Sequence, residues 1–252
     1  ALLVSTIPIV PRPKELRDAA RNKKLDFGSG WRDVKEGWSF ILTNPRVKAV
    51  IVGLGIGMFG GGMLIPLSGG FNKEVLRAGD AGYGALLFSI GMGVAVGVIA
   101  LGSLQRRLPQ EMTFVFAVGL AGVALTVAAA LSNLVIVSII LVWVGICAGA
   151  IYVLGFTILH KNVGDELRGR IFSALYMIVR FALLLGIATG GLIAAFFGYL
   201  STELVDGSVS VLDSEYSLVG VRLALWFAGF VMIGAALVAS RSMAEALRND
   251  SE

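Results

Sequence analysis

Long runs of apolar residues alternate with short polar segments along most of this chain. A helix needs about 20 apolar residues to cross a hydrocarbon core of about 30 Å, because each residue adds about 1.5 Å. Six runs are long enough and are apolar on every face, whereas helices of a soluble bundle carry a charged face. The pattern therefore predicts an all-α integral membrane protein with a six-transmembrane-helix bundle. The expected spans are 47–67, 82–104, 112–131, 134–159, 171–197 and 218–240.

The composition also indicates a membrane as the main solvent. Of the 252 residues, 56% are hydrophobic and 15% are charged, whereas soluble domains have about 25% charged residues. The single cysteine, Cys147, excludes an intramolecular disulfide. The sequence contains no phosphate-binding loop, no His/Cys cluster at metal-ligand spacing and no Ser/His/Asp set. We therefore expect no enzyme activity, no cofactor and no metal site.

Most of the 21 Lys and Arg residues flank the spans on one side of the expected bundle. The opposite side includes the segment 199–217, which carries acidic residues and no Lys or Arg. Basic residues concentrate in cytoplasmic loops, so both termini are expected in the cytoplasm of a multi-pass protein of the inner or plasma membrane. This topology accounts for the pI of about 9.4, and we expect no nucleic-acid partner.

Four regions make up the expected organisation. Residues 1–10 are interpreted as the end of a preceding transmembrane helix, which implies a chain cut from a longer protein. Residues 11–45 form a cytoplasmic linker whose segment 31–43 predicts an amphipathic helix on the membrane surface, with Trp31, Val34, Trp38, Ile41 and Leu42 on one face. Residues 46–241 form the bundle, and residues 242–252 form a cytoplasmic tail.

Glycine is abundant in the expected spans, and small residues four apart let membrane helices approach closely. We expect helix packing at the pairs Gly53/Gly57, Gly93/Gly97, Gly145/Gly149 and Gly186/Gly190. The run Gly60-Gly61-Gly62 followed by Pro66 predicts a bent or locally unwound segment, because Gly weakens a helix and Pro removes a backbone hydrogen bond. Such a segment serves either as a gate or as a site of tight packing.

Arg180 is the one charge expected near the middle of a span, about 14 Å from the start of the fifth span. A charge at that depth faces a wet cavity or a partner, unless the span begins elsewhere and the side chain snorkels to the interface. Arg222 lies about one turn inside its span, and snorkelling is the expected outcome there. The six spans contain no carboxylate, so the titrating acid of a proton-coupled carrier would lie elsewhere.

The run Asp165-Glu166-Leu167-Arg168-Gly169-Arg170, followed by Arg180, Gly186 and Gly190, resembles a loop and helix of the major facilitator superfamily. The resemblance is to its drug- and siderophore-exporter branch, which includes macrolide-efflux and enterobactin-exporter proteins. Ala81-Gly82-Tyr83-Gly84 and Glu36-Gly37-Trp38 are similar to the same branch. One departure is the loop motif: Gly102 and Arg107 are retained, but Arg106 stands where the superfamily usually has Asp.

The resemblance implies the C-terminal half of a twelve-helix carrier, with a missing N-terminal six-helix half and the lipid bilayer as partners. It further implies a proton-coupled exporter of amphiphilic small molecules that works by alternating access about a midplane site. The first alternative is a siderophore or lysolipid exporter of the same fold. The second is a six-helix membrane scaffold or receptor that transports nothing.

The charge asymmetry makes a topological prediction. With Cys147 replaced, single cysteines at Ser208 and Ser214 should react with a membrane-impermeant maleimide added outside intact cells. A single cysteine at Gln105 should react only after permeabilisation, because basic loops are retained in the cytoplasm. The reverse labelling pattern would overturn the orientation.

Overall fold

The computed structural model describes residues 43–105, 107–205, 208–211, 214–217 and 219–249. The expected end of a preceding helix at 1–10 lies outside the described residues, as does nearly all of the 11–45 linker with its surface helix. Arg106 and the last residues of the tail also lie outside them.

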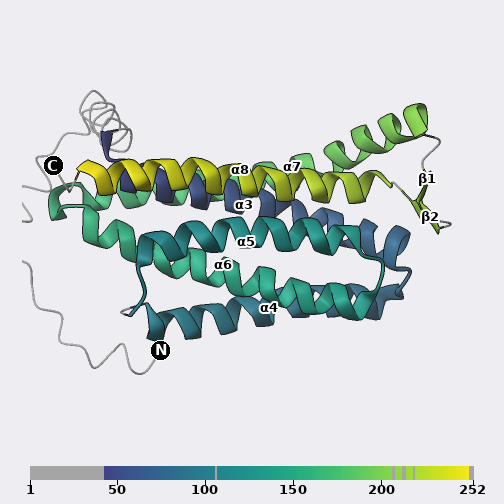
Figure 1. Cartoon of the computed structure of the whole chain (residues 1–252), viewed down its shortest axis with the longest axis horizontal. Coiled ribbons are helices and arrows are strands. Elements are labelled where there is room, and N and C mark those ends of the chain that lie inside the picture. The colour runs from purple at the N-terminus through teal and green to yellow at the C-terminus, as the bar shows by residue number, and fades with distance from the viewer. Residues whose placement is uncertain (1–42, 106, 206–207, 212–213, 218, 250–252) are drawn as a thin grey trace, which may run out of the picture.

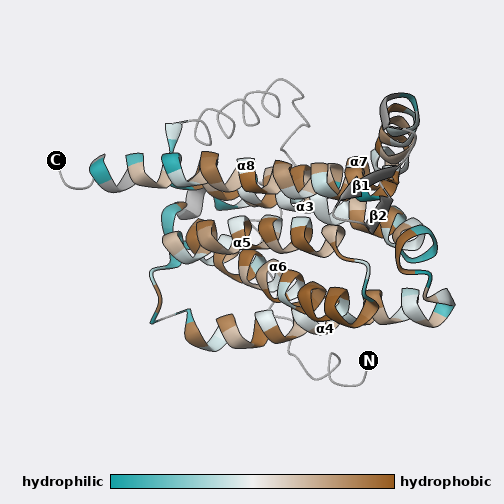
Figure 2. Cartoon of the chain, turned by 45° about the vertical axis from the view of Figure 1, so that its right-hand side comes forward, coloured by the Kyte–Doolittle hydropathy of each residue, from teal (hydrophilic) through white to brown (hydrophobic). Residues whose placement is uncertain are grey.

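Six long helices form an elongated bundle (Figure 1). They are α3 (Pro45–Phe71), α4 (Gly79–Leu104), α5 (Gln110–Ala130), α6 (Leu134–Asn162), α7 (Asp165–Val205) and α8 (Gly220–Asn249). A π-helix, η1 (Asn72–Leu76), continues α3, and strands β1 (Ser208–Val211) and β2 (Ser214–Ser217) pair as an antiparallel hairpin between α7 and α8. All six helices are long and apolar enough to cross a membrane, and hydrophilic residues gather towards their ends (Figure 2). The predicted six-helix membrane bundle is confirmed.

Some helices run well past the expected spans because polar residues continue them beyond the apolar runs. α7 exceeds the expected span 171–197 at both ends, and α8 continues beyond residue 240. Side-chain caps fix other ends: Asn44 Oδ1 accepts a hydrogen bond from Val47 N at 3.2 Å, with Pro45 starting α3. Hydropathy thus locates the membrane crossings, and capping and polar residues decide where the helices stop.

The connections gather at two ends of the bundle because successive helices alternate in direction (Figure 1). One end, here called the basic end, holds the start of α3, the α4–α5 and α6–α7 connections and the end of α8. The opposite end, here called the hairpin end, holds the α3–α4 and α5–α6 connections and the β1–β2 hairpin. The basic residues Lys48, Arg107, Lys161 and Arg168 lie at the basic end.

A bent or locally unwound segment is expected at Gly60-Gly61-Gly62 and Pro66, and the local unwinding is wrong, because α3 is helical through all four residues. The irregular segment comes later, after η1 ends at Leu76, where Arg77 has φ 52° and Gly79 has φ 64°. The buried Asn72 side chain braces this turn by donating from Nδ2 to the Gly79 carbonyl oxygen at 2.6 Å. Extended packing along α3 therefore outweighs the weak helix preference of its glycines.

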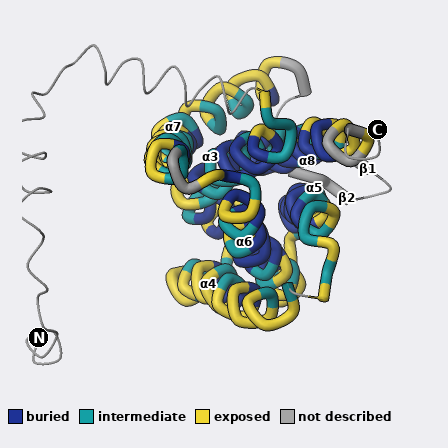
Figure 3. The backbone as a smooth tube through the Cα atoms, turned by 90° about the vertical axis from the view of Figure 1, so that its left-hand side faces the viewer, coloured by how far each residue is buried: buried dark blue, intermediate teal, exposed yellow. Residues whose placement is uncertain are grey.

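Three helix pairs make the most extensive contacts: α4 with α6, α3 with α7, and α5 with α8. If α3, α4 and α5 are matched in order with α6, α7 and α8, the α4–α6 pair corresponds to the α3–α7 pair. The bundle thus has the pairing of two repeated three-helix units related by a pseudo-two-fold axis. End-on, α7, α3, α6 and α4 lie in an arc, with α5 and α8 on the far side (Figure 3). The least buried helices are α4 and α7, at the two ends of that arc.

Glycine allows backbone-to-backbone contact within the α4–α6 and α3–α7 pairs. A Cβ atom added to Gly145 would overlap the Ile90 carbonyl oxygen, and one added to Gly93 would overlap that of Val142. Similar overlaps would arise at Gly97, Gly149 and Gly186. These five glycines lie between helices of this bundle, so their motifs mark internal pairing rather than an outward face. In α5–α8, single glycines do the same: a Cβ on Gly122 would come 2.8 Å from the Gly229 carbonyl oxygen.

The α4–α6 contact leads to a stability prediction. Gly145→Ala should destabilise the bundle by about 1–3 kcal/mol, because a side chain forced into a close-packed contact moves the backbones apart. The matched control is Gly84→Ala, where nothing lies within 4 Å of the added Cβ, and it should leave stability unchanged. The buried Cys147 thiol allows the measurement, because it should react with a maleimide dye only as the bundle unfolds on heating. Equal midpoints for the two variants would contradict this contact.

Candidate functional site

A small apolar cavity, here called the central pocket, lies at mid-length of α3, α4 and α6. Its volume is about 300 Å³. Its lining residues are all apolar: Gly57, Gly61, Leu64, Ile65, Leu87, Ile90, Gly91, Ala121, Val144, Ala148 and Met232. A Cβ added to Gly57 or Gly61 would meet nothing within 4 Å. Gly57 therefore departs from the helix-packing role expected for it, because its open side faces the pocket rather than a neighbouring helix.

The other glycines expected in the gate or in helix packing separate into different environments. A Cβ on Gly62 would overlap the Leu183 carbonyl oxygen, and one on Gly190 would lie 3.0 Å from Pro66 Cγ. Both belong to the α3–α7 contact. Gly60 faces Met232 of α8 at 3.0 Å, and Gly53 faces the Phe114 ring at 2.8 Å, measured to an added Cβ. Of the gate set, Gly61 alone lines the central pocket.

An aromatic cluster joins α6 to α7 on the side of the central pocket nearer the basic end. It consists of Tyr152, Phe156 and His160 from α6 with Phe172 and Tyr176 from α7. The Phe156 ring is central, with ring centroids 4.7 Å from Tyr152, 5.8 Å from Phe172 and 5.6 Å from Tyr176. Tyr152 and Tyr176 are each 46% exposed, so both rings present an edge to the surroundings. Tyr152 lies one helical turn from Ala148, which lines the central pocket.

Arg180 lies at the level of this site. Contacts between α3 and α7 bracket it: an added Cβ on Gly55 would lie 3.3 Å from Ile178, and one on Gly62 would overlap Leu183. Arg180 therefore lies level with the stretch of α3 that holds Gly57 and Gly61. It also follows Tyr176 by one turn, and its side chain is exposed. A guanidinium at this level of an apolar helix pays a large cost if it faces lipid tails.

The spacing of the aromatic residues is a signal in the sequence that points to this cluster. Tyr152, Phe156 and His160 follow one another at intervals of four residues, as do Phe172, Tyr176 and Arg180. That spacing puts each set on one helix face. The sequence does not reveal that the two faces meet. The register between α6 and α7 depends on the glycine contacts of α6 with α4 and of α7 with α3.

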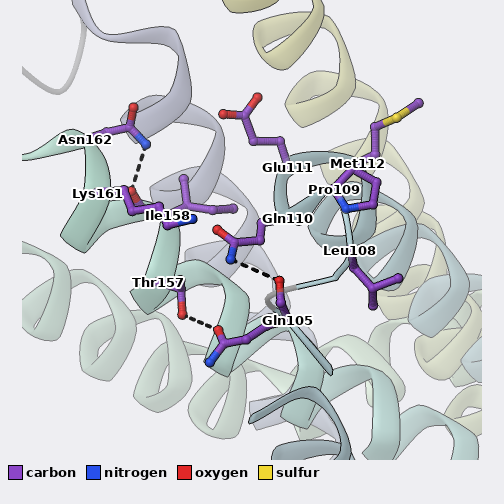
Figure 4. Close-up of a pocket in the computed structure, with 10 residues that line it drawn as sticks. All are labelled: Gln105, Leu108, Pro109, Gln110, Glu111, Met112, Thr157, Ile158, Lys161 and Asn162. Carbon is purple, nitrogen blue, oxygen red and sulfur yellow. Dashed lines mark hydrogen bonds between the residues drawn. The ribbon is translucent and has the colours of Figure 1, made fainter. Parts of the chain in front are cut away.

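A larger hollow at the basic end, here called the loop pocket, has a volume of about 700 Å³ (Figure 4). It lies between the α4–α5 connection, the start of α5 and the end of α6. Thr157 Oγ1 donates to Gln105 Oε1 at 2.7 Å, and Gln110 Nε2 donates to the Gln105 carbonyl oxygen at 3.1 Å. Beside it, Arg46 Nε lies 2.7 Å from Glu111 Oε1, an ion pair that joins α3 to α5. These bonds hold three helix ends together at this side.

The loop-motif residues also lie at the basic end. Gly102 is exposed with open space around an added Cβ, and Arg107 is exposed in the connection that follows α4. α7 begins at Asp165, and its first turns carry half-buried Arg168 with exposed Gly169 and Arg170. Arg168 and Arg170 each have interaction partners in the structure. Arg106, the residue at the usual Asp position, lies outside the described residues.

Arg222 behaves differently from the snorkelling side chain expected at its position. It is 2% exposed at the hairpin end, and its Nη2 donates to Ser132 Oγ at 2.8 Å. Arg222 thereby connects α8 to the α5–α6 connection. Trp226, one turn further along α8, donates from Nε1 to the Thr126 carbonyl oxygen at 3.1 Å. The sequence does not show these pairings, because their partners lie 90 and 100 residues away.

The buried position of Arg222 gives a second stability prediction. Arg222→Leu should lower the thermal midpoint, because a hydrogen bond to a charged group contributes about 1.5–3 kcal/mol. Arg241→Leu is the matched control on the same helix, since Arg241 is exposed at the basic end. Both are measured through the thermal exposure of Cys147. A midpoint for Arg222→Leu no lower than for Arg241→Leu would show that Arg222 does not stabilise the bundle.

The chemistry of the site suits ligand binding. It combines an apolar pocket, exposed aromatic rings and one guanidinium. Within the described part of the chain, no three His, Cys, Asp or Glu residues are grouped to hold a metal ion.

Comparison with known proteins agrees with this architecture. The sequence profile of the Major Facilitator Superfamily matches residues 1–187, which include the first four described helices and part of α7. No curated protein sequence matches the chain. The match covers most of the 252 residues. The chain therefore belongs to the Major Facilitator Superfamily, whose members are membrane transporters.

Proposed function

We propose that this chain is the C-terminal half of a secondary active transporter that exports amphiphilic small molecules. In this proposal an N-terminal six-helix half completes the carrier, and the two halves rock about a midplane site to give alternating access. The coupling ion is the proton. Membership of the superfamily supports transport, and the resemblance of the DELRGR segment and its flanking glycines to drug and siderophore exporters supports the direction.

The observation that carries the proposal is the open arc of α7, α3, α6 and α4 (Figure 3), together with the exposed Arg180 at the level of Gly57 and Gly61 of α3. Its outer helices α4 and α7 are the least buried of the six. A face that carries an exposed arginine suits a wet cavity between two halves better than contact with lipid. A six-helix scaffold surrounded by lipid would leave this arginine in hydrocarbon.

The walls of this face suit an amphiphilic cargo. The central pocket offers apolar surface, and the aromatic cluster offers flat rings with polar edges. Sites of this kind bind by apolar contact and orient by a few polar groups. Acidic side chains in the described helices lie near helix ends, as Glu74, Asp80 and Glu111 do. Proton coupling therefore assigns the titrating acid to the N-terminal half.

Transport should depend on Arg180 in the complete carrier. Arg180→Ala and Arg180→Gln should reduce efflux by about tenfold or more, because loss of a charged interaction of 1.4 kcal/mol or more corresponds to that factor. Arg180→Lys should restore efflux only in part, because a compact ammonium does not reproduce the planar guanidinium fork. The measurement is efflux from cells or proteoliposomes, normalised to folded protein.

A structural role for Arg180 gives a different result. Its loss would lower the yield of folded protein and leave transport per folded molecule intact. Arg241→Gln serves as the matched control, because Arg241 is exposed at the basic end, away from the arc. Normal normalised efflux in Arg180→Ala would refute the functional assignment of this residue.

A further inference from the structure

We infer that Arg180, Tyr152 and Tyr176 form a subsite for the anionic group of an aromatic amphiphile, with the central pocket receiving its apolar part. The inference rests on the proposed transport function and names the substrate class that this half selects. An apolar cavity alone would bind amphiphiles of any charge. The polar groups beside it decide which charge is favoured.

Arg180 lies at the depth of the central pocket, and the two tyrosines lie about one helical turn nearer the basic end. Arg180 is level with Gly57 and Gly61 of α3, as the Gly55–Ile178 and Gly62–Leu183 contacts require. Tyr176 precedes Arg180 by one turn on α7. The Phe156 ring contacts both Tyr152 and Tyr176, with ring centroids 4.7 and 5.6 Å away, so it links the two tyrosines across α6 and α7. The subsite therefore adjoins the central pocket through Tyr152 and Ala148.

Donors dominate the polar chemistry of this face. A guanidinium has five N–H donors and no acceptor, and a phenol hydroxyl donates well to an anionic oxygen. Both tyrosine hydroxyls lack a hydrogen-bond partner within the part of the chain that the structure describes. The Glu111 carboxylate lies at the basic end, where it forms an ion pair with Arg46. Within the part of the chain that the structure describes, no carboxylate is paired with Arg180, so an anionic ligand would meet the donors of one guanidinium and two phenols.

Aromatic rings favour a ligand that is itself flat. Exposed edges of Tyr152 and Tyr176 and the half-buried Phe156 present ring surface at stacking distance from one another. Aromatic pairs contribute beyond the area that they bury, through offset or edge-to-face geometry. The walls of the central pocket consist of Gly, Ala, Val, Leu, Ile and Met, which suit an apolar ring or chain.

A matched pair of dyes isolates the charge. The probes are 8-anilino-1-naphthalenesulfonate and N-phenyl-1-naphthylamine, which share a ring skeleton and differ by the sulfonate. Binding to the complete carrier in uncharged lipid vesicles is followed by dye emission excited through tryptophan, with protein-free vesicles subtracted. The wild type should bind the sulfonate dye more tightly than the neutral dye.

Three variants then assign the preference. Arg180→Gln should weaken binding of the sulfonate dye about tenfold or more and leave the neutral dye unchanged, which also shows that the variant is folded. Arg180→Lys should retain part of the preference. Tyr176→Leu should weaken both dyes, because both stack on the ring. Arg241→Gln, at the basic end, should change neither.

The outcomes separate this inference from the proposed function. Equal affinity of wild type and Arg180→Gln for the sulfonate dye would overturn the inference, and would favour an acid of the other half as the partner of Arg180. A wild-type preference for the neutral dye would overturn it as well. Arg180-dependent binding without efflux of the sulfonate dye would uphold the subsite and refute export. Efflux that does not depend on Arg180 would uphold export and refute the subsite.

Discussion

The direct contact of helix backbones at glycine positions is the constraint on which the rest of this structure depends. In lipid, helices gain little from hiding apolar side chains from one another, so close van der Waals packing holds them together. The contacts of Gly93 with α6 and of Gly186 with α3 bring these pairs so near that larger side chains point elsewhere. Those side chains form the lipid surface and the open arc. The position of the central pocket follows, because Gly57 and Gly61 are left over on the unpaired side of α3.

Two arginines show how the same side chain meets opposite demands in this bundle. Arg222 is buried near an end, where Ser132 accepts one of its hydrogen bonds and α8 is tied to the α5–α6 connection. Arg180 is exposed near mid-depth on the least buried helix. Burial without partners is costly for any charge. Arg222 has such a partner, and its hydrogen bond helps to hold α8 in the bundle. Arg180 keeps its hydrogen-bonding capacity for something outside the bundle, which is the property that a ligand site requires.

The hydropathy pattern predicted six membrane-spanning helices correctly, because a bilayer requires about 20 consecutive apolar residues in a helix that crosses it. Sequence patterns failed where the answer depends on distant partners. The glycines of α3 suggested unwinding, but contacts of Gly60 and Gly62 with α8 and α7 keep the helix intact. Arg222 looked like an interfacial residue because Ser132 is 90 positions away. The aromatic cluster needed the relative register of α6 and α7, which local spacing does not contain. Arg180 was identifiable because a lone charge in an apolar run is conspicuous without any partner.

The length of α7 changes how the protein meets its surroundings. At about 1.5 Å per residue, its 41 residues extend about 60 Å, roughly twice the thickness of a hydrocarbon core. A single crossing does not need that length, and Figure 1 shows the last turns of α7 diverging from the bundle. Antibody fragments raised against the folded protein would have in these turns an epitope that is continuous with the helix that carries Arg180.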